Sequence, residues 1–282
     1  MREDFAAFIL TRGRPDNVKT YDMLKKQGYT GKIFFILDDE DITAEKYIEK
    51  YGKDNVFIIN KNEIAKQFDT GDISKDTRTV VYSRNACFNI AKALGLRYFL
   101  QLDDDYYFVH HRYEEAGRLV SKRINNLDKL FSYMIDFLNE SNALTVALAQ
   151  GGDFLGGVNN DFFRKRVKRK AMNTFFCDVE KPFQFVGRIN EDVNTYTLLG
   201  NRGELIFSVA DANIVQAQTQ LKKGGMTDVY LDKGTFIKSF YSVMYSPQCV
   251  KISEIGSKHK RLHHCITWNN CTPMILSESV KR

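Results

Sequence analysis

The sequence contains no apolar stretch long enough to cross a membrane. A membrane-spanning helix needs about 20 consecutive apolar residues, whereas the apolar runs of this 282-residue chain, such as 5–10 and 33–37, are far shorter. The charged residues 2–4 lead directly into a strand-like segment, so a signal peptide is not expected either. These features predict a soluble, cytoplasmic protein that does not contact a membrane.

The sequence also lacks a paired cysteine motif. Its five cysteines are odd in number and widely spaced, which is typical of reduced thiols. They are Cys87, Cys177, Cys249, Cys265 and Cys271. The spacing of His263, His264, Cys265 and Cys271 matches no common zinc site, so zinc is disfavoured.

A Walker motif is missing as well, because no Gly-Lys-Ser/Thr follows the glycine-rich residues 151–157. The mild net charge of +6 is unevenly distributed, and one basic run attracts polyanions through phosphate contacts. We interpret residues 151–170 as a mobile substrate-binding loop, with Phe162 and Phe163 available for stacking. A solvated charged loop and a nuclear-import signal are the alternatives. The cations of the run are Arg164, Lys165, Arg166, Lys168, Arg169 and Lys170.

Apolar runs alternate with helical patterns in the first hundred residues. The runs at 5–10, 33–37, 56–59 and 98–102 have no polar alternation, as expected of parallel strands covered on both faces. Helical patterns occupy residues 16–28, 45–51 and 83–94. The chain is therefore predicted to be an α/β protein with a Rossmann-like, mainly parallel central sheet flanked by helices.

The second half of the chain continues with less regular patterns. We predict a helix at 127–139, strands at 144–149 and 205–210, and a helix that a turn within 187–196 opens and that ends near Gly200. Residues 235–245 are ambiguous between strand and helix.

Three carboxylates follow the strand at 98–102. Side chains alternate along a strand, so Asp103 and Asp105 share one face and Asp104 points to the other. Two carboxylates on one face offer hard oxygen ligands to Mg²⁺ or Mn²⁺, which reach a substrate's phosphates through one or two protein carboxylates. A polar strand end without a function is the alternative.

Charged residues also follow the neighbouring predicted strands, at the edge where open α/β sheets bind ligands. Arg12 and Arg14 follow the first strand, and arginine suits diphosphate oxygens. Asp38 follows the second, where acids bind a nucleoside's base or ribose. Arg84 lies in the first turn of a helix that Ser83 is predicted to cap, and can hold an anion there. Surface arginines and solvated loop acids are the alternatives.

Glu191 and Asp192 open a later predicted helix. Capping alone explains acids at this position. The helix dipole also keeps a carboxylate ionised, which a general base beside a cation site requires.

The C-terminal tail carries a basic patch able to close over a diphosphate, although each of its histidines is more simply a surface residue. Any of the three histidines is also a candidate for the metal or diphosphate site. The patch consists of Lys258, His259, Lys260, Arg261, His263 and His264.

The order of these motifs resembles a GT-A glycosyltransferase. In that fold a helix with an Arg-Asn pair, here in residues 80–85, precedes the strand that delivers Asp-x-Asp, here in 98–105. A later Glu-Asp at a helix start supplies the acceptor base. More narrowly, residues 9–15, 37–40 and 187–192 resemble the TET-associated glycosyltransferases. Relatives of these enzymes in T-even-like phages add sugars to 5-hydroxymethylcytosine in DNA.

The resemblance implies one GT-A glycosyltransferase domain over residues 1–282. Its nucleotide-sugar-binding half would be 1–107, its acceptor-binding half 108–250 and its tail 251–282. The implied reaction transfers glucose or arabinose from a UDP-sugar to the hydroxymethyl group of 5-hydroxymethylcytosine in double-stranded DNA. It would depend on Mn²⁺ or Mg²⁺ and invert the anomeric centre, although a retaining enzyme can use the same donor half. A phage-encoded protein would act in the host cytoplasm.

The resemblance also implies a role for each motif. Arg12, Arg14, Asp38 and Arg84 would hold the nucleotide. Asp105 would ligate the metal directly, and Asp103 would contact the ribose or a metal-bound water. Asp104 is therefore expected to tolerate replacement best. Asp192 would act as the base, oriented by Glu191, and the basic run at 164–170 would contact DNA phosphates.

Three alternatives remain at this point. A GT-A enzyme acting on a protein or glycan would make the basic run incidental. A metal-dependent nuclease or nucleotidyltransferase would use Asp103 and Asp105 with Glu191. A nucleic-acid-binding module would need none of these carboxylates. The last two do not explain the Arg84-Asn85 pair that precedes the acids.

Overall fold

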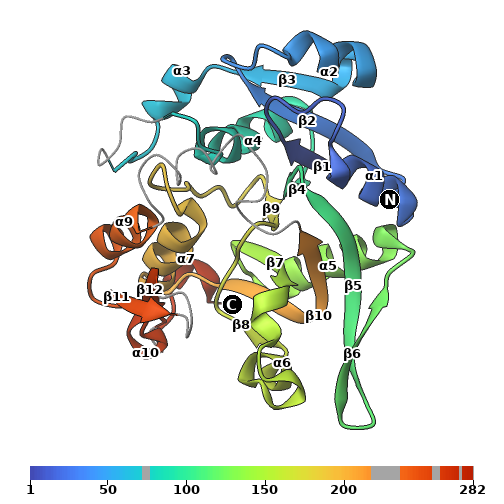
Figure 1. Cartoon of the computed structure of the whole chain (residues 1–282). Coiled ribbons are helices and arrows are strands. Elements are labelled where there is room, and N and C mark those ends of the chain that lie inside the picture. Colours follow the sequence, from blue (N-terminus) through green and yellow to red (C-terminus); the bar gives the residue numbers. More distant parts are fainter. Residues whose placement is uncertain (72–76, 217–235, 256–260, 273–274, 282) are drawn as a thin grey trace.

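The computed structural model of the chain describes residues 1–71, 77–216, 236–255, 261–272 and 275–281. A ten-stranded sheet passes through the molecule and is covered by helices on both faces (Figure 1). A separate two-stranded sheet lies near the C-terminal end. This arrangement confirms the predicted α/β class with a central sheet flanked by helices.

The strands of the large sheet are β1 (Phe5–Leu10), β2 (Lys32–Asp38), β3 (Val56–Ile59), β4 (Tyr98–Asp103), β5 (Tyr106–Glu115), β6 (Arg118–Arg123), β7 (Thr145–Gln150), β8 (Val167–Lys168), β9 (Phe175–Asp178) and β10 (Ile206–Gln216). The small sheet pairs β11 (Val250–Ile255) with β12 (Arg261–Ile266). The helices are α1 (Lys19–Lys26), α2 (Ala44–Tyr51), α3 (Lys61–Ala65), α4 (Val81–Ala93), α5 (Leu127–Ser141), α6 (Asp161–Lys165), α7 (Glu191–Asn201), α9 (Ile237–Tyr245) and α10 (Trp268–Cys271).

The first four strands are parallel, in the order β3-β2-β1-β4. Their apolar sequences suit burial on both faces, and every residue of β1 is buried. The register pairs Leu10 with Asp103, so the carboxyl ends of β1 and β4 meet at one edge. The residues that follow β1, β2 and β4 are therefore close together in space.

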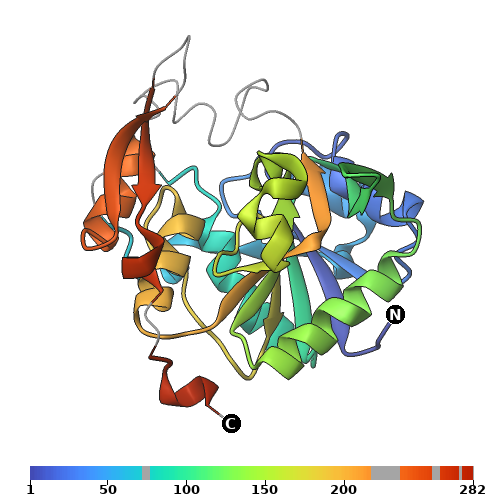
Figure 2. The same cartoon turned by 90° about the horizontal axis from the view of Figure 1, so that it is seen from below.

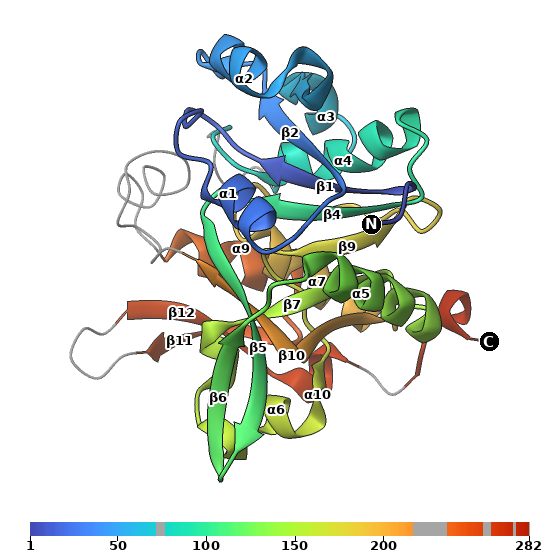
Figure 3. The ribbon, with the colours of Figure 1, turned by 90° about the vertical axis from the view of Figure 1, so that its right-hand side faces the viewer.

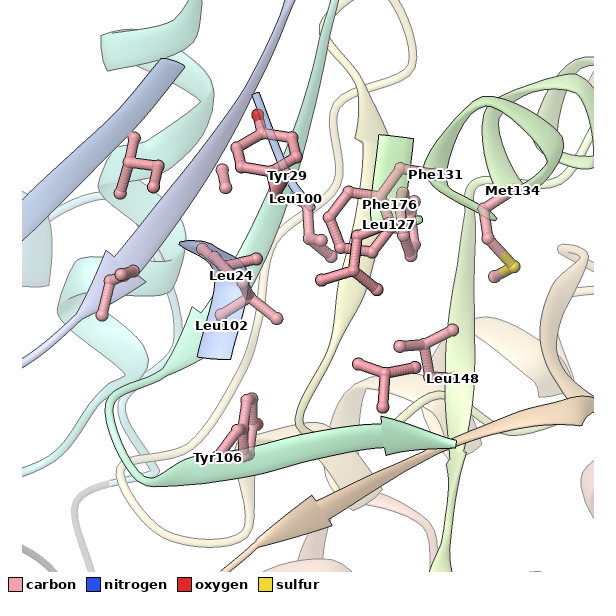
Figure 4. Close-up of a cluster of buried hydrophobic side chains, with 14 of the residues drawn as sticks. Leu24, Tyr29, Leu100, Leu102, Tyr106, Leu127, Phe131, Met134, Leu148 and Phe176 are labelled. Carbon is pink, nitrogen blue, oxygen red and sulfur yellow. The ribbon is translucent and has the colours of Figure 1, made fainter. Parts of the chain in front are cut away.

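Alternating side chains of these strands enter two separate cores. Phe5, Ala7 and Ile9 join the core beneath α1, α2 and α5, whereas Phe8 joins the core beneath α3, α4 and α7. Figure 4 shows part of the first core, where Phe131 of α5 lies beside the apolar side chains of β4 and β9. At about 25 cal/mol per Å² of buried apolar surface, these cores supply most of the energy that holds the sheet.

The second half of the sheet is mixed. The antiparallel strand β9 separates β4 from β7, and β10 runs parallel to β7 but antiparallel to β5. The sequence patterns did not reveal β9 or the β5–β6 hairpin, because β9 has only four residues and the hairpin is rich in charged residues. Figure 3 shows the hairpin extending away from the rest of the sheet.

Helix α1 begins later than predicted. The expected start was at Pro15 and Asp16, whereas the helix begins at Lys19. The backbone before it is engaged elsewhere, because the N–H groups of Gly13 and Arg14 donate to the side chains of Asp41 and Tyr47. The turn after β1 is thereby tied to the segment after β2.

Residues 151–170 are folded, contrary to the predicted mobile loop. They form two 3-10 turns, the short helix α6 and strand β8. Phe162 and Phe163 are buried against Phe154 in a small core, so they are not available to stack on a substrate. The apolar residues of this segment form a small core of their own. The sequence did not indicate this core, because many charged residues surround them.

The C-terminal region packs beside α7 (Figure 2). Residues 237–245, which were ambiguous in the sequence, form helix α9. The β11–β12 pair and α10 follow it, while Lys258, His259 and Lys260 of the basic patch lie outside the described residues. Among the residues that are described, no helix has the length and apolar character needed to span a membrane.

Candidate functional site

The candidate site lies at the carboxyl edge of the parallel strands. Arg12 and Arg14 follow β1, Asp38 ends β2 and Asp103 ends β4. Because these strands are parallel and in register, their ends place four charged side chains at one edge. Ligands of open α/β sheets bind at this edge.

Arg84 is the centre of the site. It projects from α4, which begins at Val81, so Ser83 lies inside the helix and does not cap it as predicted. The Arg84 side chain is only 2 % exposed. Its Nη2 donates to Asp103 Oδ1 and its Nε donates to Glu191 Oε1, each at 2.9 Å. One buried guanidinium therefore joins the end of β4 to the start of α7.

Two aromatic rings complete the surroundings of this arginine. Its guanidinium carbon lies 4.9 Å from the ring centre of Phe175 and 5.8 Å from that of Phe185. Burial acts to lower the pKa of Arg84, but the charges of Asp103 and Glu191 outweigh it and hold the pKa above its usual value. The group remains a fixed cation between two carboxylates.

Asp103 and Asp105 differ in their surroundings. Asp103 Oδ2 lies 3.1 Å from the Tyr106 hydroxyl, while Oδ1 bonds to Arg84. Its side chain is still 30 % exposed, and Asp105 is half-buried in the turn after β4. No group of three or more His, Cys, Asp or Glu side chains that could hold a metal exists within the described residues. A cation here would need oxygen ligands from a substrate as well.

Asp104 occupies the opposite face, as the alternation predicted, but that face is not solvent. Its Oδ1 bonds to Arg14 Nη1 at 2.9 Å and its Oδ2 accepts from Thr11 Oγ1 at 2.7 Å. Burial raises the pKa of Asp104, against the effect of Arg14. The expectation that Asp104 tolerates replacement best did not include these contacts, which join this buried carboxylate to the loop after β1.

A second charged cluster surrounds Asp38. Arg12 Nη1 lies 3.3 Å from Asp38 Oδ2, and its Nη2 lies 3.3 Å from Glu40 Oε2. The buried Lys61 reaches the same two acids, with Nζ 3.5 Å from Asp38 Oδ1 and 2.7 Å from Glu40 Oε2. The Lys61 hydrogen bond, followed by the charges of Lys61 and Arg12, outweighs burial and lowers the pKa of Glu40.

Lys61 was not selected from the sequence. The available signal was its position one residue beyond Asn60, which follows β3 at the same sheet edge as Arg12 and Asp38. Polar residues 61–79 without a clear period obscured that signal.

Glu191 and Asp192 are both buried at the start of α7. Burial first, and then the neighbouring Glu191, raise the pKa of Asp192 to about 7, although Arg84 acts in the opposite direction. The dipole at the helix start predicted a readily ionised carboxylate; burial is the stronger effect here. Asp192 is thus poised to exchange a proton near neutral pH.

The C-terminal region supports the start of α7. Asn190 has a left-handed backbone (φ 60°), and its Nδ2 donates to Ser242 Oγ of α9 at 2.6 Å. The same Nδ2 lies 3.3 Å from His264 Nδ1. Burial, followed by His263, lowers the pKa of His264 to about 3, so its ring is neutral at physiological pH. The structure brings His264 to the segment that precedes Glu191.

The sequence model of the TET-associated glycosyltransferases matches residues 5–225. The chain belongs to this family. The resemblance found in the motifs is thereby confirmed, and the protein is a glycosyltransferase. The nuclease and the non-enzymatic binding module are excluded as its main function.

Comparison with curated proteins finds no match. Among solved structures, glucosyl-3-phosphoglycerate synthase from Mycobacterium tuberculosis, in complex with Mg²⁺ and uridine diphosphate, is similar with a TM-score of 0.47 at 7 % identity, covering 93 % of this chain and 87 % of that one. A complex of the same synthase with Mn²⁺, uridine diphosphate and phosphoglyceric acid has a TM-score of 0.45 at 10 % identity, covering 93 % and 86 %.

The basic run of this TET-associated glycosyltransferase is not one uniform patch. Arg164, Lys165 and Arg166 are exposed around the end of α6. Arg169 donates to the Glu204 carbonyl at 2.7 Å, and Lys170 Nζ lies 2.7 Å from Asp153 Oδ1. The second half of the run, which also contains Lys168 above the ring of Trp268, is partly buried. The first half is exposed to a macromolecule, although Lys165 pairs with Asp161 and Arg166 pairs with Asp211, each at an exposed position.

Proposed function

We propose that this glycosyltransferase moves glucose or arabinose from a UDP-sugar to the hydroxymethyl group of 5-hydroxymethylcytosine in double-stranded DNA, with inversion and with the help of Mg²⁺ or Mn²⁺. The observation that carries the proposal is the double contact of Arg84 with Asp103 and Glu191. It links the acid that ends a strand at the ligand-binding edge to the helix that begins with the candidate base.

The nucleotide would lie along the carboxyl ends of β1, β2 and β4. Arg12 and Arg14 offer guanidinium groups suited to phosphate oxygens, and each is already oriented by an acid of the same edge. Asp38 offers carboxylate oxygens to a ribose or a base. Paired side chains of this kind lose little conformational entropy when a small ligand binds.

The end of β4 suits a divalent cation shared with the substrate. Asp105 would hold Mg²⁺ or Mn²⁺ directly. Asp103, which bonds to Arg84 and Tyr106, would contact the ribose or a metal-bound water. Mg²⁺ is usually held by one or two carboxylates together with substrate phosphates, which agrees with the small number of acids here. When bound, the cation stabilises negative charge on the departing diphosphate.

Asp192 would act as the general base. It removes the proton of the acceptor hydroxyl as that oxygen forms a bond to the anomeric carbon of the sugar. The bond from this carbon to the diphosphate breaks, and its electron pair leaves with UDP. A base is most effective when its pKa is close to the working pH, and the pKa of about 7 for Asp192 satisfies this condition. Glu191, held by Arg84, would orient the base or the donor sugar.

DNA is proposed as the acceptor on the strength of the family and of the exposed cations at the end of α6. Arg164, Lys165 and Arg166 would contact phosphates and position the duplex without reading its sequence. Lys168, Arg169 and Lys170 would also contact DNA phosphates, but we expect them to contribute less to binding because they are partly buried.

The test is a transfer assay with Mn²⁺, a panel of UDP-sugars and three acceptors: hydroxymethylated duplex, ordinary duplex and a glycoprotein. The nucleosides and proteins are then weighed by mass spectrometry. We expect one sugar on hydroxymethylcytosine alone. Sugar on the glycoprotein alone would show that the acceptor is a protein or glycan and not DNA. No gain in mass of any acceptor with any donor would refute the proposed reaction.

A further inference from the structure

The β5–β6 hairpin is a two-stranded ribbon that begins at the candidate site and ends far from it. Tyr106, its first residue, is the third residue after Asp103. Strand β10 pairs with β5 only as far as His111, so residues 112–121 are paired only within the hairpin. Figures 1 and 3 show this part projecting from the sheet.

The ribbon is firmly built at both ends. At its base, the Gln27 side chain accepts from the Val109 N–H and donates to the Val109 carbonyl, each at 2.8 Å. At its tip, Ala116 (φ 51°) and Gly117 (φ 75°) make a two-residue turn with left-handed backbone at both positions. Turns of this type match the twist of paired strands. The ten residues of β5 thus extend over about 30 Å as a rigid arm.

The ribbon carries more positive than negative charge, although Glu115 is the register partner of Arg118. Its four cations are Arg112, Arg118, Lys122 and Arg123. Among the residues that the structure describes, none of the four forms an ion pair. Arg118, Lys122 and Arg123 are exposed, and the two acids of the ribbon, Glu114 and Glu115, lie towards its tip.

The ribbon and the end of α6 share one small core. Leu119 of the ribbon packs against the cluster that contains Phe154, Phe162 and Phe163. The Arg112 guanidinium lies 4.5 Å from the centre of the Phe154 ring, and that of Arg166 lies 4.4 Å from the centre of the Phe163 ring. Burial lowers the pKa of Arg112, which a neighbouring anion would offset. The two sets of cations are therefore fixed relative to each other.

We propose that the β5–β6 ribbon enters the major groove of the acceptor duplex and that the cations of the ribbon and of α6 hold its phosphates. This inference rests on the proposed function and names the surface that delivers the acceptor. A two-stranded β-ribbon fits the major groove, and the substituent at C5 of a pyrimidine projects into that same groove. A ribbon seated there would leave the hydroxymethyl group beside the sheet edge that carries Asp103.

The test reverses two charges on the ribbon. Arg118 and Lys122 are exposed and lie on one face, so Arg118→Glu with Lys122→Glu removes two phosphate contacts without disturbing the core. The matched control is Lys46→Glu with Lys53→Glu, which makes the same change of net charge on exposed residues beside β3, at the opposite end of the sheet. A charge-conserving variant, Arg118→Lys with Lys122→Arg, is the second comparison.

Binding to a fluorescent hydroxymethylated duplex is measured by anisotropy over a series of salt concentrations. The ribbon variant should bind about tenfold or more weakly and lose about 2 from the slope of log affinity against log salt. The control pair and the charge-conserving variant should follow the wild type. An unchanged affinity and slope in the ribbon variant, or an equal loss in the control pair, would overturn the ribbon proposal.

The same samples separate the two proposals. If the wild type transfers sugar to DNA and the ribbon variant has the same KM for the duplex, the ribbon assignment fails and the reaction stands. If the ribbon variant loses affinity and salt slope but the wild type never transfers a sugar, the ribbon assignment stands and the reaction fails. A wild type that does not bind duplex DNA would contradict both.

Discussion

The cations at the two ends of the large sheet differ in whether they form ion pairs. Beside β1–β4, each of Arg12, Arg14, Lys61 and Arg84 is paired with at least one carboxylate. On the β5–β6 ribbon, no cation forms an ion pair with a described residue. Paired charges hold a precise arrangement for a small ligand, whereas unpaired surface charges gain energy from a large polyanion by releasing its counterions.

The largest effect is expected from Arg84→Met. The change leaves Asp103 and Glu191 without their shared cation, and breaking a buried pair costs about 3–5 kcal/mol. We expect loss of sugar transfer together with a lower urea midpoint. Lys92→Met, at an exposed position of the same helix, should change neither. Wild-type transfer by Arg84→Met would show that the joining of β4 to α7 is dispensable.

The second largest loss of activity is expected from Asp192→Asn. Loss of a general base lowers kcat by about 10²–10⁴-fold. In the wild type, kcat should fall as the pH drops below about 7, because Asp192 becomes protonated. Asp22→Asn, in the first turn of α1, is the matched control. An unchanged kcat in Asp192→Asn would assign the base to another residue.

The same carboxylate makes stability depend on pH. The folded protein raises the pKa of Asp192 above its unfolded value, so folding favours the protonated form and Asp192 destabilises the protein increasingly as the pH rises towards 7. Asp192→Asn should therefore raise the melting temperature more at pH 8 than at pH 4. Equal shifts at both pH values would mean that burial does not control this group.

Replacement of Asp104 should mainly lower stability, whereas replacement of Asp105 should mainly affect catalysis. Asp104→Ala removes one buried and one partly buried hydrogen bond and should lower the free energy of unfolding by about 1–3 kcal/mol. Asp105→Ala should cost less stability and instead raise the Mn²⁺ concentration needed for transfer. Thermal melts and Mn²⁺ titrations of both variants measure this contrast. A larger loss of stability in Asp105→Ala, with a raised Mn²⁺ requirement in Asp104→Ala, would show that Asp105 is the structural residue and Asp104 the metal ligand.

A smaller effect is expected from Lys61→Met. Among the described residues, it leaves Arg12 as the one cation that pairs with Asp38 and Glu40. The KM for the donor should therefore rise by about tenfold, while the affinity for DNA stays the same. Lys66→Met removes an exposed lysine close by and should have no effect. A change in DNA affinity with an unaltered donor KM would contradict the assignment of the paired cations beside β1–β4 to the donor and of the ribbon cations to DNA.

The parallel half of the sheet could be predicted because its strands are continuous apolar runs that end in charged residues. β1 and β3 have the predicted bounds, and Arg12, Asp38, Arg84 and Asp103 do gather at one edge. The alternation of side chains also gave Asp104 its correct face. What it could not give was the partner on that face, since Arg14 and Thr11 come from a loop whose path depends on the fold.

The other half was less legible for a physical reason. Its strands are short or charged, and the same composition describes a solvated loop. Phe162 and Phe163 seemed available for stacking because their core partners, Phe154 and Ala210, are distant in sequence or outside any clear pattern. The ribbon was missed because neighbouring charges mask its alternation.

The most direct test of the central claim compares the wild type with Asp192→Asn on one hydroxymethylated duplex, with Mn²⁺ and the accepted UDP-sugar. We predict equal binding of the duplex, a sugar on hydroxymethylcytosine with the wild type, and almost none with the variant. Product formation by Asp192→Asn at the wild-type rate, or none by the wild type, would contradict the account.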